Sequence, residues 1–185
     1  MLRLECDEGF PRLQIRVIDA LESEIVRLAD APEIAGAVIT GTDRAFAAGA
    51  EIAEVARLTP TLALEFSRRG QEVLGRIASI AKPVVAAIRG YCIGGGLDLA
   101  LACRARIAAA DAVFAHPGVT LGIITGWGGT QRLPQLIGRG HALELLVTGG
   151  RIRANEALAW GLVSKVSADG ELLDDAIQLT RALAR

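Results

Sequence analysis

Val84–Ile88 (VVAAI) is an apolar run that is followed, after five residues, by glycines 94–96 and then by residues 97–102 (LDLALA). The run predicts a buried strand, and the glycines predict a tight turn into a short helix that ends at Ala102. Strand, turn and helix therefore follow one another within 19 residues.

The same alternation continues on both sides of this stretch. Apolar runs predict strands over residues 35–40, 105–110, 113–115 and 162–166. Apolar residues at helical spacing predict helices over residues 15–31, 62–80, 141–148, 155–160 and 171–184, and the Gly- and Ala-rich residues 41–60 are expected to form a loop. Alternating strands and helices predict an α/β fold with largely parallel strands and helices on their outer faces.

Length and composition favour one domain over residues 1–185. The chain is 51% hydrophobic and carries a net charge of −1, with its arginines scattered rather than clustered. This balance argues against nucleic acid or an anionic membrane as a partner, and no apolar run approaches the roughly 18 residues of a membrane span. We therefore expect a cytoplasmic protein.

Cysteine and histidine are too few for a metal or disulfide framework. The three cysteines lack C-x-x-C spacing, and the chain has two histidines. We expect no metal site, and Cys92 and Cys103 are expected to pack as small apolar groups.

A second segment, residues 46–51 (FAAGAE), resembles the glycine turn because it too follows a predicted strand and joins small residues to a carboxylate. Unpaired N–H groups at a helix start attract negative charge, and glycine allows a carbonyl oxygen to approach closely. Two such amides around one point would form an oxyanion hole.

Asp98 follows Gly95 by three positions, so both face roughly the same side of the predicted helix. A carboxylate beside an oxyanion hole suits proton transfer at the carbon next to a polarised carbonyl. Two simpler interpretations stay open: a tight turn that packs the helix, and an ordinary first-turn aspartate favoured by the helix dipole. Neither glycine cluster fits G-x-G-x-x-G, the P-loop pattern or G-x-S-x-G.

The motifs together resemble the crotonase superfamily, also called the enoyl-CoA hydratase/isomerase family. The resemblance runs almost end to end, over residues 37–41, 45–52, 82–96, 121–122, 128–134, 146–149 and 157–163. It implies a spiral of ββα units, an acyl-CoA thioester as ligand and a place in fatty acid metabolism. It implies no cofactor, because coenzyme A is part of the substrate.

The resemblance also implies roles for named residues. The amides of Ala50 and Gly95 would bind the thioester oxygen and stabilise its enolate. Backbone around Ala48, Ala50 and Ile52 would lie beside the adenine and pantetheine portions of coenzyme A. Glu51 would be a structural acid.

Hydratases of the family carry two acids, one at the position of Asp98 and one at the position that here is Gly118. The leading expectation is an enzyme of the enoyl-CoA hydratase/isomerase type. With the second acid replaced by Gly118, slow hydration and single-acid chemistry both stay open, the latter as isomerisation through Asp98, thioester hydrolysis or decarboxylation. His116 is a candidate surrogate base, with a packed structural histidine as the alternative. A catalytically weak acyl-CoA-binding protein is the second hypothesis.

Both ends depart from the resemblance. Residues 2–5 align with the family's second strand, so we expect the first strand to be absent, together with the C-terminal helices that would follow Arg185. Because those helices cover the acyl pocket and help to build trimers in relatives, the expected homotrimer or dimer of trimers follows from the resemblance alone.

Overall fold

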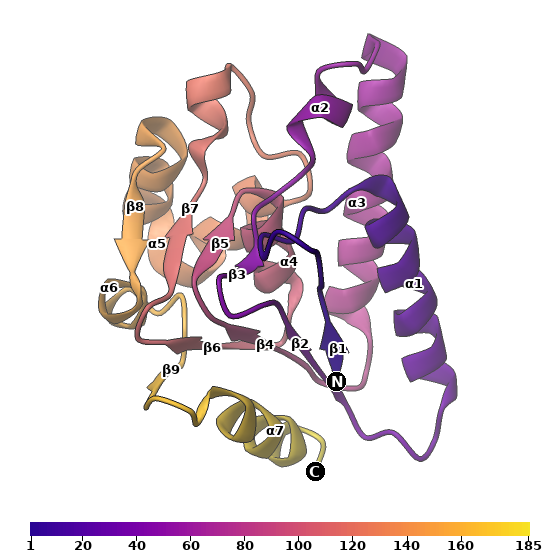
Figure 1. Cartoon of the computed structure of the whole chain (residues 1–185), viewed down its shortest axis with the longest axis vertical. Helices are drawn as coiled ribbons and strands as arrows, with labels where there is room; N and C mark the ends of the chain where they lie inside the picture. Colours follow the sequence, from indigo (N-terminus) through magenta and orange to yellow (C-terminus); the bar gives the residue numbers. More distant parts are fainter.

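Two sheets organise the chain, and the computed structural model describes all 185 residues (Figure 1). The first sheet is parallel throughout and follows the order β1-β2-β4-β6-β9. Its strands are Leu2–Arg3, Ala37–Thr40, Val84–Ile88, Ala105–Ala109 and Lys165–Ser167. The expectation of an α/β fold with largely parallel strands is confirmed.

The second sheet has four short strands in the order β3-β5-β7-β8. They are Ala45–Ala47, Tyr91–Ile93, Val113–Ala115 and Arg151–Arg153. The first three are parallel, and β8 runs antiparallel to β7.

Each of three consecutive units places one strand in each sheet and then a helix. The units are β2–β3–α3, β4–β5–α4 and β6–β7–α5, with α3 at Pro60–Ser79, α4 at Gly95–Ala102 and α5 at Gly129–Thr148. The short α2 (Ile52–Val55) lies within the first unit, and the 3-10 helix η1 (Pro117–Leu121) within the third. This is the spiral of ββα units that the resemblance implies.

The helix after the glycine triplet lies inside the molecule rather than on its surface. Gly96 and every later residue of α4 are buried, and Figure 1 shows α4 surrounded by other elements. The main core of 36 buried residues includes residues of α4 and the buried stripe of α1 (Ile15–Asp30). The body of α4 is therefore held by the core, while its first residue, Gly95, stays partly exposed.

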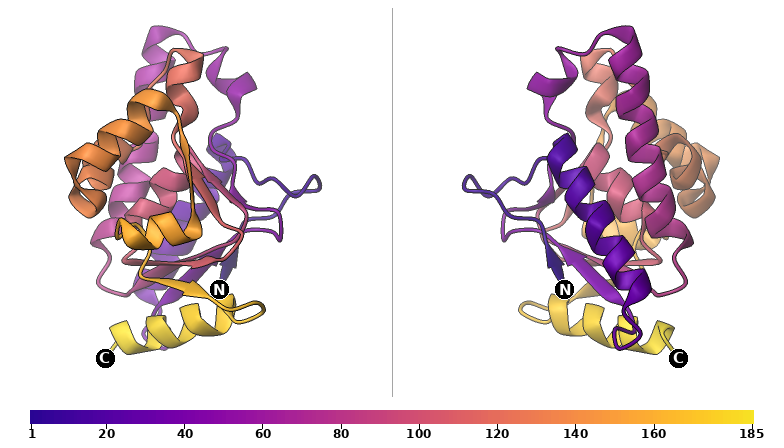
Figure 2. Two further views of the ribbon diagram at one scale, coloured as in Figure 1. Left: turned by 90° about the vertical axis from the view of Figure 1, so that its left-hand side faces the viewer. Right: turned by 90° about the vertical axis from the view of Figure 1, so that its right-hand side faces the viewer.

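A second apolar cluster covers the opposite face of the first sheet. Alternate residues of β2, β4 and β6 pack there against Leu172 and Ala176 of α7 (Leu172–Leu183). Both views of Figure 2 show α7 crossing beneath this sheet. Because both faces of its central strands are buried, the strands read as continuous apolar runs.

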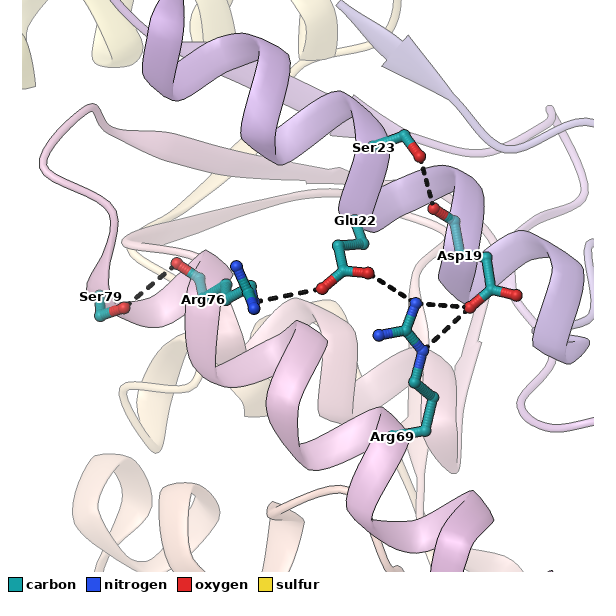
Figure 3. Close-up of polar contacts among 6 residues, drawn as sticks. All are labelled: Asp19, Glu22, Ser23, Arg69, Arg76 and Ser79. Atoms are coloured by element: carbon teal, nitrogen blue, oxygen red, sulfur yellow. Dashed lines mark hydrogen bonds and ion pairs between the residues drawn. The ribbon is translucent and has the colours of Figure 1, made fainter.

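Charged residues join α1 to α3 on the surface (Figure 3). Arg69 of α3 bonds Asp19 and Glu22 of α1, each at 2.6 Å, and Arg76 Nε lies 3.2 Å from Glu22 Oε1. We call these four residues the α1–α3 ion network.

Several boundaries differ from the sequence expectations. Residues 41–60 contain β3 and α2 rather than loop alone, and β8 was not expected. These elements have three or four residues, too few to show a period. The strand expected over residues 162–166 begins later in the structure, as β9 at Lys165–Ser167. The helix expected over residues 155–160 is α6, at Ala154–Ala159. Residues 129–148 form one helix that is kinked where Gly138 adopts φ 78° and ψ 160°.

None of the helices has the length and apolarity needed to span a bilayer.

Candidate active site

A cavity of about 270 Å³ lies where α2, α3, the start of α4 and residues 116–127 meet. Figure 1 shows α2 and η1 at the same end of the molecule, above α4. Every residue predicted for the site lines this cavity: Ala48, Ala50, Ile52, Gly95, Asp98, His116 and Gly118. Apolar side chains from α2, α3, β5, η1 and residues 123–127 form most of the remaining wall.

Two glycines with positive φ bring the two predicted amides together. Gly49 has φ 95° and precedes Ala50, while Gly94 has φ 53° and precedes the first residue of α4. A Cβ at either position would be strained, because L side chains rarely adopt these angles. The sequence therefore needs glycine at both turns.

The amide nitrogens of Ala50 and Gly95 are neighbours in space. A Cβ built on Gly95 would lie 3.4 Å from Ala50 N. Since a Cβ is about 2.5 Å from its own nitrogen, the two nitrogens are at most about 6 Å apart. Ala50 N–H takes part in no backbone hydrogen bond, and Gly95 N–H, as the first of α4, has no intrahelical acceptor.

Trp127 packs directly against Gly95. A Cβ on Gly95 would lie 2.7 Å from Cζ3 of Trp127. The indole is 3% exposed, its ring lies 5.1 Å from that of Phe66, and its Nε1 donates to Phe66 O at 3.3 Å. Trp127 thus forms a rigid wall of the cavity beside the two amides.

Asp98 is the buried carboxylate of the cavity, with 1% of its surface exposed. The hydroxyl of Thr125 donates a hydrogen bond to Oδ2, whereas Oδ1 has no hydrogen-bond partner. Burial raises the pKa of Asp98 to about 6, while the Thr125 hydroxyl, the N–H groups of Trp127 and Gly129 and the charge of Arg132 act to lower it. The carboxyl group therefore titrates close to neutral pH.

His116 lies beside the unpaired oxygen of Asp98. Its Nε2 is 3.4 Å from Asp98 Oδ1, and neither atom makes a hydrogen bond. The ring is 3% exposed, and burial lowers the pKa of His116 to about 4. At neutral pH the imidazole is thus uncharged, so the two side chains do not form an ion pair there.

Gly129, the first residue of α5, has no side chain and so provides the space that Asp98 and His116 occupy. A Cβ at this position would lie 2.1 Å from Asp98 Oδ1 and 3.0 Å from His116 Nε2. The glycine of the 126–129 turn therefore has a role beyond chain reversal. Sequence reasoning described this turn without connecting it to Asp98, and it missed Thr125, Trp127 and Gly129 as site residues.

Gly118 sits in a tight turn at the cavity wall. Ile123 N donates to Gly118 O at 3.0 Å, and a Cβ on Gly118 would lie 2.8 Å from Ile123 O. An acidic side chain at this position would push against backbone. The local structure is thus fitted to glycine.

Glu51 is held away from this constellation of groups. It caps α2 by accepting from Ala53 N, and Arg12 donates to it at 2.9 Å. The bond from Arg12 keeps the pKa of this carboxyl below its usual value. These contacts agree with the expected structural acid. No group of three or more His, Cys, Asp or Glu side chains is arranged to hold a metal ion.

Comparison with known proteins gives a consistent picture. The family profile described as Enoyl-CoA hydratase/isomerase matches residues 13–185. A crotonyl-CoA hydratase of Syntrophomonas wolfei is 45% identical over 84% of this chain, and a probable enoyl-CoA hydratase of Mycobacterium tuberculosis is 39% identical over 95% of it. The crystal structure of enoyl-CoA hydratase from Bacillus anthracis superposes with a TM-score of 0.91 at 35% identity, over 98% of this chain.

The matches cover a smaller share of each relative than of this chain. The chain spans 60% of the Syntrophomonas protein, 68% of the mycobacterial one and 71% of the Bacillus chain. Pseudomonas aeruginosa DspI superposes with a TM-score of 0.93 at 33% identity, over 99% of this chain and 75% of its own. By profile, sequence and fold, the chain belongs to the enoyl-CoA hydratase/isomerase family.

Proposed function

We propose that this protein binds an acyl-CoA thioester, polarises its carbonyl with the N–H groups of Ala50 and Gly95, and moves a proton at the adjacent carbon through Asp98. The reaction is of the enoyl-CoA hydratase/isomerase type, a lyase or isomerase reaction through a thioester enolate. The observation that carries the proposal is the meeting of two neighbouring amides and one buried carboxylate in a single cavity.

The two amides supply the electrostatic part of the chemistry. Negative charge develops on the thioester oxygen as the enolate forms, and fixed donors stabilise that charge more than the neutral carbonyl. Gly49 and Gly94 allow the positive-φ turns that place the two amides. Because Trp127 packs on Gly95, the donors need little reorganisation during the reaction.

Asp98 supplies the proton transfer. With a pKa of about 6 it is mostly ionised at neutral pH, yet it can hold a proton without a large cost. Such matching of pKa to working pH favours general acid–base catalysis. In an isomerisation, Asp98 removes a proton from one carbon of the acyl chain and returns it to another.

His116 is proposed as the group that takes part of the work of the acid replaced by Gly118. It is neutral at pH 7 and therefore has a lone pair to accept a proton, although its lowered pKa makes it a weak base. Backbone at Ala48 and Ile52 is proposed to contact coenzyme A, and the apolar wall to receive the acyl chain. No cofactor beyond the coenzyme A of the substrate is required.

A crotonyl-CoA assay tests the proposal. Purified protein is mixed with crotonyl-CoA, and loss of the conjugated double bond is followed by absorbance, with products separated by chromatography. We expect turnover that Asp98→Asn reduces by about 10²–10⁴-fold, while Asp111→Asn, a matched change at an exposed turn, leaves the rate unaltered. Equal rates for Asp98→Asn and the unaltered protein would contradict it.

Gly118 favours a second candidate, a catalytically weak acyl-CoA-binding protein. The turn at Gly118 leaves no room for the missing acid, so binding without turnover is a coherent outcome. Calorimetric titration with crotonyl-CoA that shows tight binding and no product supports this candidate. Release of free coenzyme A or carbon dioxide in the same assay supports hydrolysis or decarboxylation.

The homotrimer, or dimer of trimers, and the cytoplasmic location stay predictions from the resemblance. Light scattering on the purified chain tests the first, and fractionation of the source cell tests the second. A monomer at micromolar concentration would contradict the trimer for this length of chain.

A further inference from the structure

The carboxylate of Asp98 has two oxygens in different surroundings. Oδ2 accepts from the hydroxyl of Thr125, while Oδ1 has no hydrogen-bond partner and lies 3.4 Å from His116 Nε2. Thr125 belongs to the segment between η1 and α5, so its contact with α4 joins parts of the chain that are 27 residues apart.

We propose that Thr125 is a positioning residue for Asp98: its hydroxyl holds Oδ2 and so leaves Oδ1, beside His116, as the oxygen that exchanges a proton. The inference extends the proposed function, on which its catalytic meaning rests. The positioning itself can be measured without turnover.

Packing restricts the carboxylate to this arrangement. The position that a Cβ of Gly129 would occupy is 2.1 Å from Asp98 Oδ1 and 2.9 Å from Cγ2 of Thr125. Asp98, Thr125 and His116 therefore all approach the same bare α-carbon at the start of α5. Asp98 is 1% exposed, so bulk water does not reach the carboxylate while the Thr125 side chain is in place, and the N–H groups of Trp127 and Gly129 lower its pKa less than the hydroxyl does.

Other charged and titratable groups near Asp98 do not duplicate the hydroxyl. His116 faces it from the end of β7 and is uncharged at neutral pH because burial lowers its pKa to about 4. Cys92 of β5 is fully buried, which raises the pKa of its thiol and keeps it neutral. Arg132 of α5 acts through its charge but donates its own hydrogen bond to Trp127 O at 2.9 Å.

Burial raises the pKa of Asp98, and the Thr125 hydroxyl is the largest influence that lowers it. A hydrogen bond donated to a carboxylate favours the charged form. Removing the hydroxyl should therefore raise the pH at which Asp98 titrates, whereas keeping the hydroxyl on a smaller side chain should not.

The experiment is a carbon-13 titration of the Asp98 carboxyl carbon in protein labelled with [4-¹³C]aspartate. The signal is assigned by its absence in Asp98→Asn. We expect the midpoint to rise by about one pH unit in Thr125→Val and Thr125→Ala, and to stay at the wild-type value in Thr125→Ser. Thr148→Val, which removes an exposed hydroxyl at the far end of α5, should leave it unchanged.

An unmoved midpoint in Thr125→Ala overturns the proposal, and so does a midpoint in Thr125→Ser that rises as far as in the alanine variant. Thr125 is half-buried in a loop, so the alanine variant decides the question if the valine variant does not fold. The acid limb of crotonyl-CoA turnover should move with the midpoint. If no variant turns over substrate while the titrations behave as expected, the proposed function fails and the positioning stands.

Discussion

Two groups of ionisable side chains in this molecule contrast sharply, the α1–α3 ion network and the Asp98–His116 pair. In the network, Arg69 reaches two carboxylates at 2.6 Å, and its side chain keeps 31% of its surface exposed. In the pair, two side chains with 1% and 3% exposure face each other at 3.4 Å without a hydrogen bond. The network satisfies its charges at the surface, whereas the pair leaves polar atoms unpaired in the interior.

The contrast separates charged groups that join two helices at the surface from the buried groups to which we assign the proposed chemistry. Exposed ion pairs are screened by water and contribute little to stability. Buried unpaired groups cost stability, and residues with strongly shifted pKa values gather at functional sites. The four predictions below test this contrast, from the largest expected effect to the smallest.

Asp98→Asn should have the largest effect, with opposite signs on activity and stability. Turnover falls by about 10²–10⁴-fold. The carboxyl ionises at pH 3.8 when unfolded and at about 6 when folded, so its stabilising contribution is complete below pH 3.8 and is lost as the pH rises through 6. Above that, ionised Asp98 destabilises the fold by about 3 kcal/mol.

The measurement is urea unfolding of both proteins at pH 8 and pH 4.5. We expect the asparagine variant to be more stable at pH 8, with most of its advantage lost at pH 4.5. A variant that is less stable than the unaltered protein at pH 8 contradicts the view that this carboxylate strains the interior.

Gly95→Ala should reduce turnover by about 10²-fold or more, the usual effect of disturbing a donor to an oxyanion. The new methyl group would lie 2.7 Å from the Trp127 ring, so the ring or the backbone at Gly95 must shift, which disturbs the position of the Gly95 amide. Steady-state kinetics with crotonyl-CoA measure the loss.

Gly75→Ala is the matched control, because a Cβ there meets nothing within 4 Å. In the interior of α3 it should raise stability by about 0.5–1 kcal/mol and leave turnover unchanged. Comparable activity losses in the two alanine variants would argue against a special role for the amide of Gly95.

His116→Gln should make the protein more resistant to acid. Because burial lowers the pKa of folded His116 from 6.5 to about 4, its neutral form contributes stability above pH 6.5 that is lost as the pH falls toward 4. Between pH 7 and pH 5 the free energy of unfolding of the variant should rise by about 2 kcal/mol relative to that of the unaltered protein. Unfolding curves at both pH values measure the difference, and parallel loss of stability in the two proteins would show that His116 is not held neutral.

Arg69→Met should have the smallest effect, because it removes exposed ion pairs and keeps the apolar stem. We expect a loss of about 1 kcal/mol or less in low salt, which shrinks further at 1 M salt, and unchanged turnover. Thermal unfolding at two salt concentrations checks it. A salt-independent loss of several kcal/mol would mean that the network fixes the packing of α1 on α3.

Sequence reasoning predicted most of the frame for identifiable physical reasons. β4 and the helices α1 and α3 show a clear period or an uninterrupted apolar run, and their predicted bounds agree with the structure to within two residues. β3, β8 and α2 have three or four residues each, and their pairing depends on contacts that are distant in the sequence. No local pattern could reveal them.

The residues of the candidate site likewise fall into those that could be predicted from the sequence and those that could not. Gly95 and Asp98 could be chosen from the sequence because a glycine turn beside a carboxylate has a recognisable local form, whereas Ala50 was chosen from the family resemblance; all three line one cavity. Thr125 could not be chosen, since its importance arises from a hydrogen bond across 27 residues. The environment of His116 could not be predicted from the sequence either. The sequence left a catalytic base and a packed structural residue as alternatives, and in the structure the ring is buried and also lines the cavity.

The central claim, that the amides of Ala50 and Gly95 polarise a thioester carbonyl, is tested most directly by isotope-edited infrared spectroscopy of bound [1-¹³C]crotonyl-CoA. The Asp98→Asn variant is used so that the bound ester persists. The account predicts a carbonyl stretch at lower frequency than in free crotonyl-CoA, and a return toward the free value when Gly95→Ala is added. A bound ester whose carbonyl absorbs at the free frequency in the presence of both amides would contradict it.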